Sequence, residues 1–131
     1  MKRLLVVFAL LGIIVLLFAA CSRDNTGGGG SGGGGGNTTV HLGNTNFVQE
    51  SITIKKGDSL TFVNDVAVPH IIKNGSWDGT TAKPSKEDGA PTADLTFNGN
   101  DTKTIGPFTT AGTFHLYCTV HQGMNLTVTV Q

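Results

Sequence analysis

Cysteine, charge and helical periodicity are all scarce in this 131-residue chain. It holds two cysteines, Cys21 and Cys118, and only 14% of its residues are charged. Nine basic side chains stand against nine acidic ones, and without the first 20 residues the balance is seven against nine, a formal charge of −2. A nucleic-acid-binding surface needs clustered Lys and Arg, so this class of partner is excluded. After residue 36, no window keeps the i, i+3, i+4 spacing of an amphipathic helix for three turns.

An apolar run near the start of the chain indicates a targeting segment. Lys2 and Arg3 precede the apolar residues 4–20, and small residues stand just before Cys21. This is the pattern of a secretory signal, and it resembles the bacterial lipoprotein signal, in which the cysteine becomes the lipid-modified first residue. We therefore expect a signal peptide at residues 1–20 and a lipid anchor on Cys21. The alternative is an uncleaved anchor, since 17 apolar residues are at the short end of a membrane span.

A glycine-rich stretch follows the predicted lipid site. Nine of the chain's 19 glycines lie between residues 27 and 36, and such a composition predicts a flexible linker. Residues 21–36 are thus expected to be anchor and tether, and residues 37–131 one folded domain of about 95 residues. With either form of anchor, the domain lies outside the cytoplasmic membrane, at its periplasmic or cell-surface face.

The pattern of residues 37–131 is that of an all-β domain. Short runs rich in Val, Ile, Thr and Phe alternate with clusters of Gly, Asn and Asp, which indicates a sandwich of seven or eight strands. Residues 75–92 lack a period, and we expect there a long surface excursion with at most one helical turn. The predicted strands are Thr39 to Leu42, Ser51 to Lys55, Ser59 to Asn64, His70 to Lys73, Ala93 to Phe97, Thr102 to Ile105, Thr113 to Tyr117 and Leu126 to Val130.

Potential metal ligands gather around the second cysteine. If Cys21 carries lipid, Cys118 has no disulfide partner. A lone thiol is a liability in an oxidising compartment unless it is bound, and a metal ion is the expected ligand partner. His121 and Met124 follow Cys118 at intervals of three residues, and His70 begins an earlier predicted strand. Thiolate, imidazole and thioether are soft donors that select copper over Mg²⁺ and Ca²⁺. Two histidines and a cysteine with a weak axial methionine are the ligands of a blue-copper electron-transfer site.

These ligands lie in a sequence that resembles a cupredoxin of the plastocyanin and amicyanin group over about residues 40–130. Residues 57–64 resemble the group's turn and strand, residues 69–70 its first ligand, and residues 112–123 its thiolate strand and ligand loop. The short spacing from the loop histidine to the methionine is similar to that of amicyanin. Family members usually place Asn or Ser after the first histidine, whereas Ile71 stands there in this chain.

The resemblance implies a fold, a ligand set and a function. The fold is a Greek-key β-sandwich, in which His70, Cys118 and His121 are equatorial ligands of one copper ion and Met124 is its axial ligand. The implied function is one-electron transfer between larger redox proteins by a monomer without a small-molecule substrate, and not enzymatic turnover. The rival functions are a copper store or chaperone that delivers copper to an extracytoplasmic oxidase, and a structural sandwich without metal. Only two Met and four His occur, which argues against the copper store.

The resemblance also implies where electrons enter and leave. The family's loop histidine reaches the surface through an apolar patch, which here would consist of Val68, Pro69, Val120 and Gly123 and would dock redox donors and acceptors. Tyr117 resembles plastocyanin's remote electron-entry residue, and the alternative is an ordinary exposed tyrosine.

Other aromatic and imidazole side chains have simpler interpretations. By strand parity Tyr117 faces away from Cys118, as His115 does, and both His115 and His41 are expected to face solvent. Trp77 is expected to pin the long excursion to the sandwich, with a partner contact as the alternative.

Overall fold

Nine β-strands make up the regular structure of residues 38–131, the part of the chain that the computed structural model describes. The predicted signal peptide, the lipid site Cys21 and the linker up to residue 36 lie outside the described residues. Among residues 38–131, none belongs to a helix with the length and apolar character that a membrane crossing requires. The strands are β1 (Thr39–Leu42), β2 (Ser51–Ile54), β3 (Leu60–Asn64), β4 (His70–Asp78), β5 (Thr81–Pro84), β6 (Asp94–Phe97), β7 (Thr102–Ile105), β8 (Gly112–Cys118) and β9 (Asn125–Val130).

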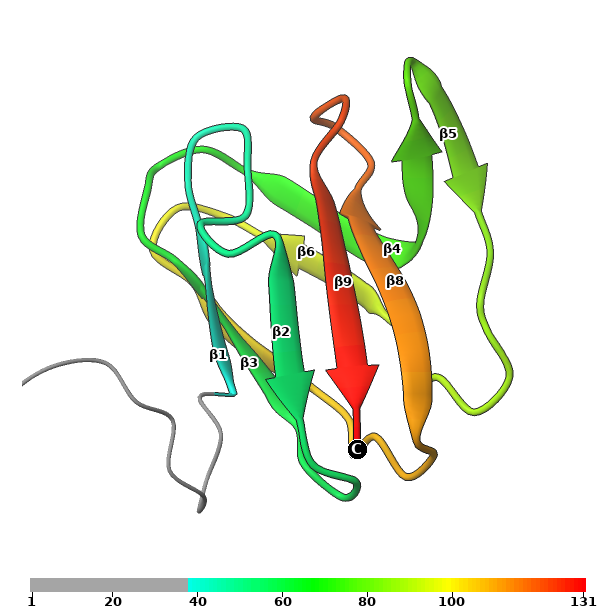
Figure 1. Cartoon of the computed structure of the whole chain (residues 1–131). Coiled ribbons are helices and arrows are strands. Elements are labelled where there is room, and N and C mark those ends of the chain that lie inside the picture. Colours follow the sequence, from blue (N-terminus) through cyan, green and yellow to red (C-terminus); the bar gives the residue numbers. More distant parts are fainter. Residues whose placement is uncertain (1–37) are drawn as a thin grey trace, which may run out of the picture. The chain divides into compact units, whose positions relative to one another are not determined.

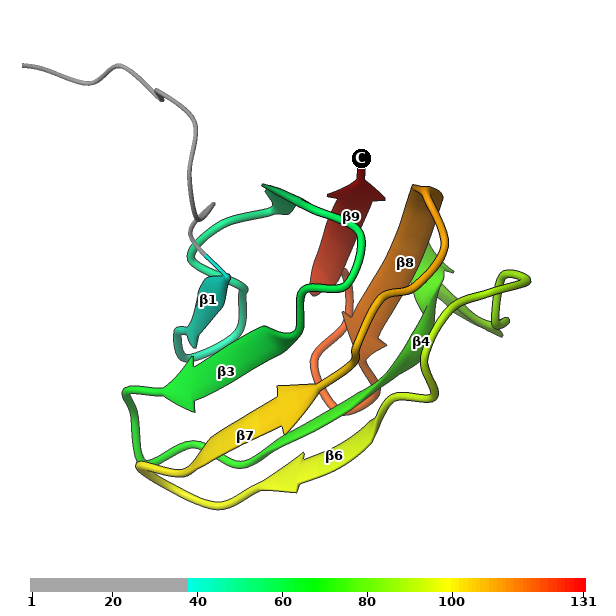
Figure 2. The ribbon, with the colours of Figure 1, turned by 90° about the horizontal axis from the view of Figure 1, so that it is seen from below.

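The strands form two sheets that face each other, as Figures 1 and 2 show. One sheet has the order β1-β3-β7, and the other has the order β2-β9-β8-β4-β5, with β6 paired to β4. β1 pairs in parallel with β3 and β2 in parallel with β9, while the remaining pairs are antiparallel. The predicted all-β sandwich is confirmed.

The core lies between the sheets and is rich in phenylalanine. In β3, Leu60, Phe62 and Asn64 alternate with less buried neighbours, because successive side chains of a strand point to opposite faces. The Phe62 ring lies 6.3 Å from that of Phe47 and 6.4 Å from that of Phe97, measured between centroids. Phe97 belongs to β6 of the other sheet, so its edge-on contact with Phe62 joins the two layers of the sandwich.

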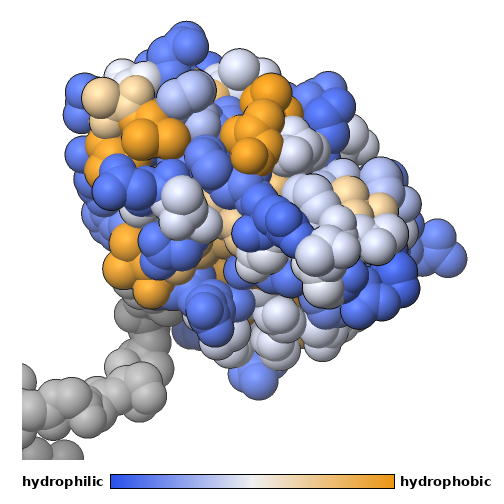
Figure 3. All heavy atoms as spheres, turned by 90° about the horizontal axis from the view of Figure 1, so that it is seen from above, coloured by the Kyte–Doolittle hydropathy of each residue, from blue (hydrophilic) through white to orange (hydrophobic). Residues whose placement is uncertain are grey.

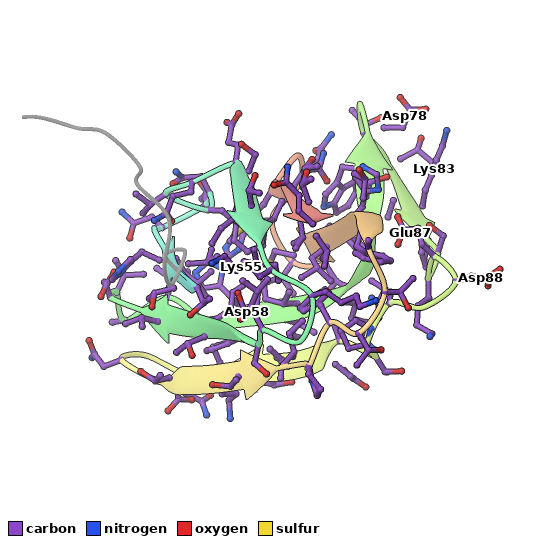
Figure 4. All side chains as sticks on the ribbon, turned by 60° about the horizontal axis from the view of Figure 1, so that its bottom comes forward. Lys55, Asp58, Asp78, Lys83, Glu87 and Asp88 are labelled. Atoms are coloured by element: carbon purple, nitrogen blue, oxygen red, sulfur yellow. The ribbon has the colours of Figure 1, made fainter. Side chains whose placement is uncertain are left out.

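The segment predicted as an irregular excursion contains a β-hairpin instead. β4 continues to Asp78, and residues 75–78 pair antiparallel with residues 81–84 of β5. An ion pair between Asp78 and Lys83 links the two strands, and Figure 4 shows these side chains together near the hairpin tip. All four residues of β5 are exposed. They therefore lack the alternation of apolar and polar residues by which a half-buried strand is recognised.

The two ends of the sandwich carry different features. The connections β1–β2, β3–β4 and β8–β9 meet at the end drawn uppermost in Figure 1, and the β4–β5 hairpin rises toward that same end. The start of β1 at Thr39 and the C-terminus lie at the opposite end. We call the uppermost end the loop end.

Gly75 allows β4 to turn into the hairpin. Its φ is +127°, and a Cβ atom there would lie 2.4 Å from the backbone oxygen of Lys83. We predict that Gly75→Ala lowers the free energy of unfolding by more than about 2 kcal/mol, since both the backbone and the β5 carbonyl would be strained. Gly79→Ala is the matched control, because its φ is +59° but its Cβ would have nothing within 4 Å; it should cost about 1 kcal/mol. Urea unfolding measures both, and equal losses would contradict the steric argument.

Candidate metal centre

Two strands and one loop bring three donor side chains together at the loop end. His70 is the first residue of β4, Cys118 is the last of β8, and His121 lies in the loop that follows. The Cys118 Sγ atom lies 3.7 Å from His70 Nδ1 and 3.4 Å from His121 Nδ1. All three donor atoms lie within 4.8 Å of one another.

This spacing fits a single metal ion. A sulfur and a nitrogen on one first-row ion, with bonds of about 2.0–2.3 Å, are expected to lie about 3.5–3.9 Å apart. The two observed sulfur–nitrogen distances are close to this range. Because thiolate and imidazole are the donors that copper prefers, His70, Cys118 and His121 are the residues that would hold a copper ion.

Met124, the fourth predicted ligand, is the last residue of the same loop. It is buried, and its backbone ties the loop together. The Met124 N–H donates to the His121 oxygen at 3.2 Å, and the Cys118 N–H donates to the Met124 oxygen at 3.0 Å. These bonds bring the two ends of the loop together, so that all three residues are fixed by one tight turn.

The electrostatic environment favours the neutral form of the first histidine. Burial lowers the pKa of His70, the neighbouring His121 lowers it further, and a backbone hydrogen bond to Gly43 acts in the opposite direction. A metal ion binds imidazole through a deprotonated nitrogen. His70 is thus kept in the form that ligates a metal.

Backbone bonds brace the site where the sequence departs from the family. Ile71 has no side-chain donor, but its carbonyl oxygen accepts the Thr119 N–H at 2.8 Å, which links β4 to the residue after the cysteine. On the other side of His70, the buried Asn64 amide donates to the Val68 oxygen at 2.8 Å and to the Asn98 oxygen at 2.9 Å. Asn64 thus supports the connection that leads into β4.

The alternative that Tyr117 is an ordinary exposed tyrosine is wrong. Tyr117 does point away from the core, but only 3% of it is exposed, because Trp77 of the hairpin covers it. The two rings are 6.0 Å apart between centroids and nearly perpendicular. Trp77 therefore pins the hairpin to the sandwich, as expected from the sequence. His115, on the same face of β8, is half-exposed and bonds to Glu87, and His41 is half-exposed and bonds to Asp65.

The surface around the loop histidine is mixed in character. Among the four predicted ligands, His121 alone is partly exposed, while the other three are buried. Of the predicted patch, Val120 is 51% exposed, Pro69 and Gly123 are also exposed, and Val68 is half-buried. Figure 3, which looks onto the loop end, shows apolar side chains in several separate places between hydrophilic ones.

Comparison with known proteins agrees with this geometry. Residues 35–131 match the family model described as copper binding proteins, plastocyanin/azurin family. Plastocyanin from Ulva prolifera is 32% identical over 91 residues, which cover 68% of this chain and 90% of that protein. Plastocyanin from Scenedesmus fuscus is 32% identical over 99 residues, which cover 71% and 98%.

A solved structure supports the fold. Amicyanin from Paracoccus versutus has a TM-score of 0.55 to this structure at 19% identity, covering 86% of this chain and 88% of that one. The family match covers residues 35–131, and the cysteine and two histidines converge as a copper site requires. The chain therefore belongs to the plastocyanin/azurin family of copper-binding proteins.

Proposed function

We propose that this protein carries single electrons between redox proteins through one mononuclear blue copper site. The observation that carries the proposal is the convergence of one sulfur and two imidazole nitrogens within 4.8 Å, from two adjacent strands of one sheet and the loop that follows one of them. Bound copper supplies the one-electron couple between Cu(II) and Cu(I).

The protein's part is to hold the donor atoms still. His70 and Cys118 sit on the adjacent strands β4 and β8, and the backbone bonds of the loop fix His121 and Met124. A site that is already assembled rearranges little when its charge changes, and small rearrangement permits fast electron transfer. Catalytic metal sites keep an open ligand position, whereas a set of four side chains fills the coordination sphere, so no substrate turnover is proposed.

Partners are proposed to dock at the loop end. Its partly exposed ligand, His121, stands next to the exposed Val120, and an apolar contact there would bring a partner's redox centre near the ring. We propose that the partners are redox proteins that donate or accept electrons, and that this protein binds them as a monomer.

We also propose that the domain works outside the cytoplasmic membrane, held by lipid on Cys21. The support is the order of basic, apolar and small residues before Cys21. Mass spectrometry of the membrane-extracted protein tests the lipid anchor, because an unmodified cysteine or an intact N-terminal segment would contradict it.

We predict that Cys118→Ser abolishes the intense thiolate-to-copper absorption band of the Cu²⁺-loaded protein, because the serine oxygen does not supply the sulfur charge transfer. Optical and EPR spectra measure this. Met124→Gln is the contrasting variant, which should keep the ion and lower its reduction potential. A pale, tetragonal spectrum of the unaltered protein would contradict a blue site. Release of the ion on each reduction would indicate copper delivery instead of electron carriage.

We predict that Val120→Asp slows electron self-exchange about tenfold, equivalent to ~1.4 kcal/mol, while the absorption band stays unchanged. The reason is that a charge must be desolvated when two copies meet at the loop end. Thr109→Asp is the control, because Thr109 is exposed but lies in the β7–β8 connection, at the end of the sandwich opposite the loop end. NMR line broadening in mixtures of the two oxidation states gives the rate. Equal effects of the two substitutions would reject the docking surface.

A further inference from the structure

The β4–β5 hairpin makes specific contacts with the ligand loop. The register of β4 with β8 runs from Ile72 opposite Cys118 to Asn74 opposite Leu116, so β4 moves away from the metal centre as it proceeds. At Gly75 the strand turns, and Figure 1 shows the hairpin rising again toward the β8–β9 loop. This turn brings Trp77 back beside Cys118.

Trp77 contacts the first residue of the ligand loop. Its indole Nε1–H donates to the Cys118 carbonyl oxygen at 2.8 Å, and its ring lies edge-on against that of Tyr117. The Cys118 N–H is already bonded to Met124. Both backbone polar groups of the cysteine are therefore held, one within the loop and one from the hairpin.

The same tryptophan is bound to the residue that follows the loop. The Asn125 side chain accepts the Trp77 backbone N–H at Oδ1, at 2.7 Å, and donates from Nδ2 to the Trp77 backbone oxygen at 3.1 Å. The Asn125 side chain thus bonds to both backbone polar groups of Trp77, as the backbone of a neighbouring strand would, although Asn125 itself belongs to β9. It stands directly after Met124, so the hairpin holds both ends of the segment Cys118 to Met124.

We propose that Trp77 and Asn125 are positioning residues of the copper centre: the hairpin latch formed by their hydrogen bonds fixes the ligand loop and tunes the reduction potential of the site. The inference rests on the copper-carrying function proposed above. The N–H of Trp77 places the positive end of its dipole toward the carbonyl of the ligating cysteine. This arrangement disfavours the extra positive charge of the oxidised site, so the latch raises the potential.

Simple packing does not account for the latch. A phenylalanine would cover Tyr117 as well as Trp77 does, yet the indole N–H is aimed at the Cys118 carbonyl, and both polar atoms of the Asn125 amide are used on one residue. Ile71 has no side-chain group to bond to the ligand loop. The side-chain hydrogen bond to the ligand loop comes instead from Trp77 in the hairpin, seven residues after His70 in the sequence.

The first test uses the full chain without copper. Trp77→Phe keeps an aromatic ring on Tyr117 and removes only the indole donor. Amide hydrogen exchange followed by NMR should then become about tenfold faster at Thr119 and Met124, whereas exchange at Thr129 in β9 should stay the same. Exchange at Thr119 and Met124 within twofold of the unaltered protein would overturn the latch.

The second test uses the copper-loaded protein. Trp77→Phe and Asn125→Ala should each lower the reduction potential and shift the thiolate-to-copper band, and together they should have less than the sum of their separate effects, because they act through one contact. Lys83→Ala is the control: it removes the ion pair with Asp78 in the same hairpin and leaves the latch bonds in place. An unchanged potential in Trp77→Phe, or an equal shift in Lys83→Ala, would overturn the proposal.

The two proposals fail in different ways. If the unaltered protein lacks the thiolate-to-copper band, the proposed function is wrong, and the copper-free exchange measurement still decides whether Trp77 fixes the loop. If that band is present and the latch variants match the unaltered protein in exchange and potential, the latch alone is wrong.

Discussion

The rest of the domain depends on one constraint, which is that a thiol and an imidazole are buried next to each other. Cys118 and His70 are fully buried, and their donor atoms face each other instead of water. Polar groups removed from water destabilise a fold unless they find partners, and an ion of matching softness is such a partner. The surrounding sandwich must hold these groups at bonding distance, because otherwise each change of charge would be accompanied by movement of the ligands.

β4 carries a metal ligand, pairs within the sheet and forms the hairpin that contacts the ligand loop. Its first residue is His70, its middle pairs with β6 on one side and β8 on the other, and its last residues form the hairpin with β5. One strand thus carries a metal ligand, the central pairing of the sheet and the hairpin that contacts the ligand loop. The turn at Gly75 permits one strand to contribute at two places, since a straight strand would carry Trp77 away from Cys118.

The sequence predicted the strands whose apolar and polar residues alternate, and it predicted the metal ligands whose donor atoms are typical of copper. β1 and β7 have the predicted bounds, because their residues alternate clearly, and the donor types around Cys118 indicate copper without any structure. The hairpin could not be predicted, because β5 is exposed throughout and has no alternation. Strand parity placed Tyr117 on the outer face, but its cover comes from Trp77, 40 residues earlier. The role of Asn125 gave no signal, since single asparagines are common in turns and loops.

The domain has a clear polarity along its strands. Thr39, where the described chain begins its first strand, and the C-terminus lie at one pole, and the metal-binding loop lies at the other. An attachment made at the C-terminus or directly before Thr39 thus leaves the partly exposed His121 at the far end. A fusion partner, a resin or an electrode surface joined at that pole would not obstruct the proposed docking face, so the domain is suited to immobilisation in a single orientation.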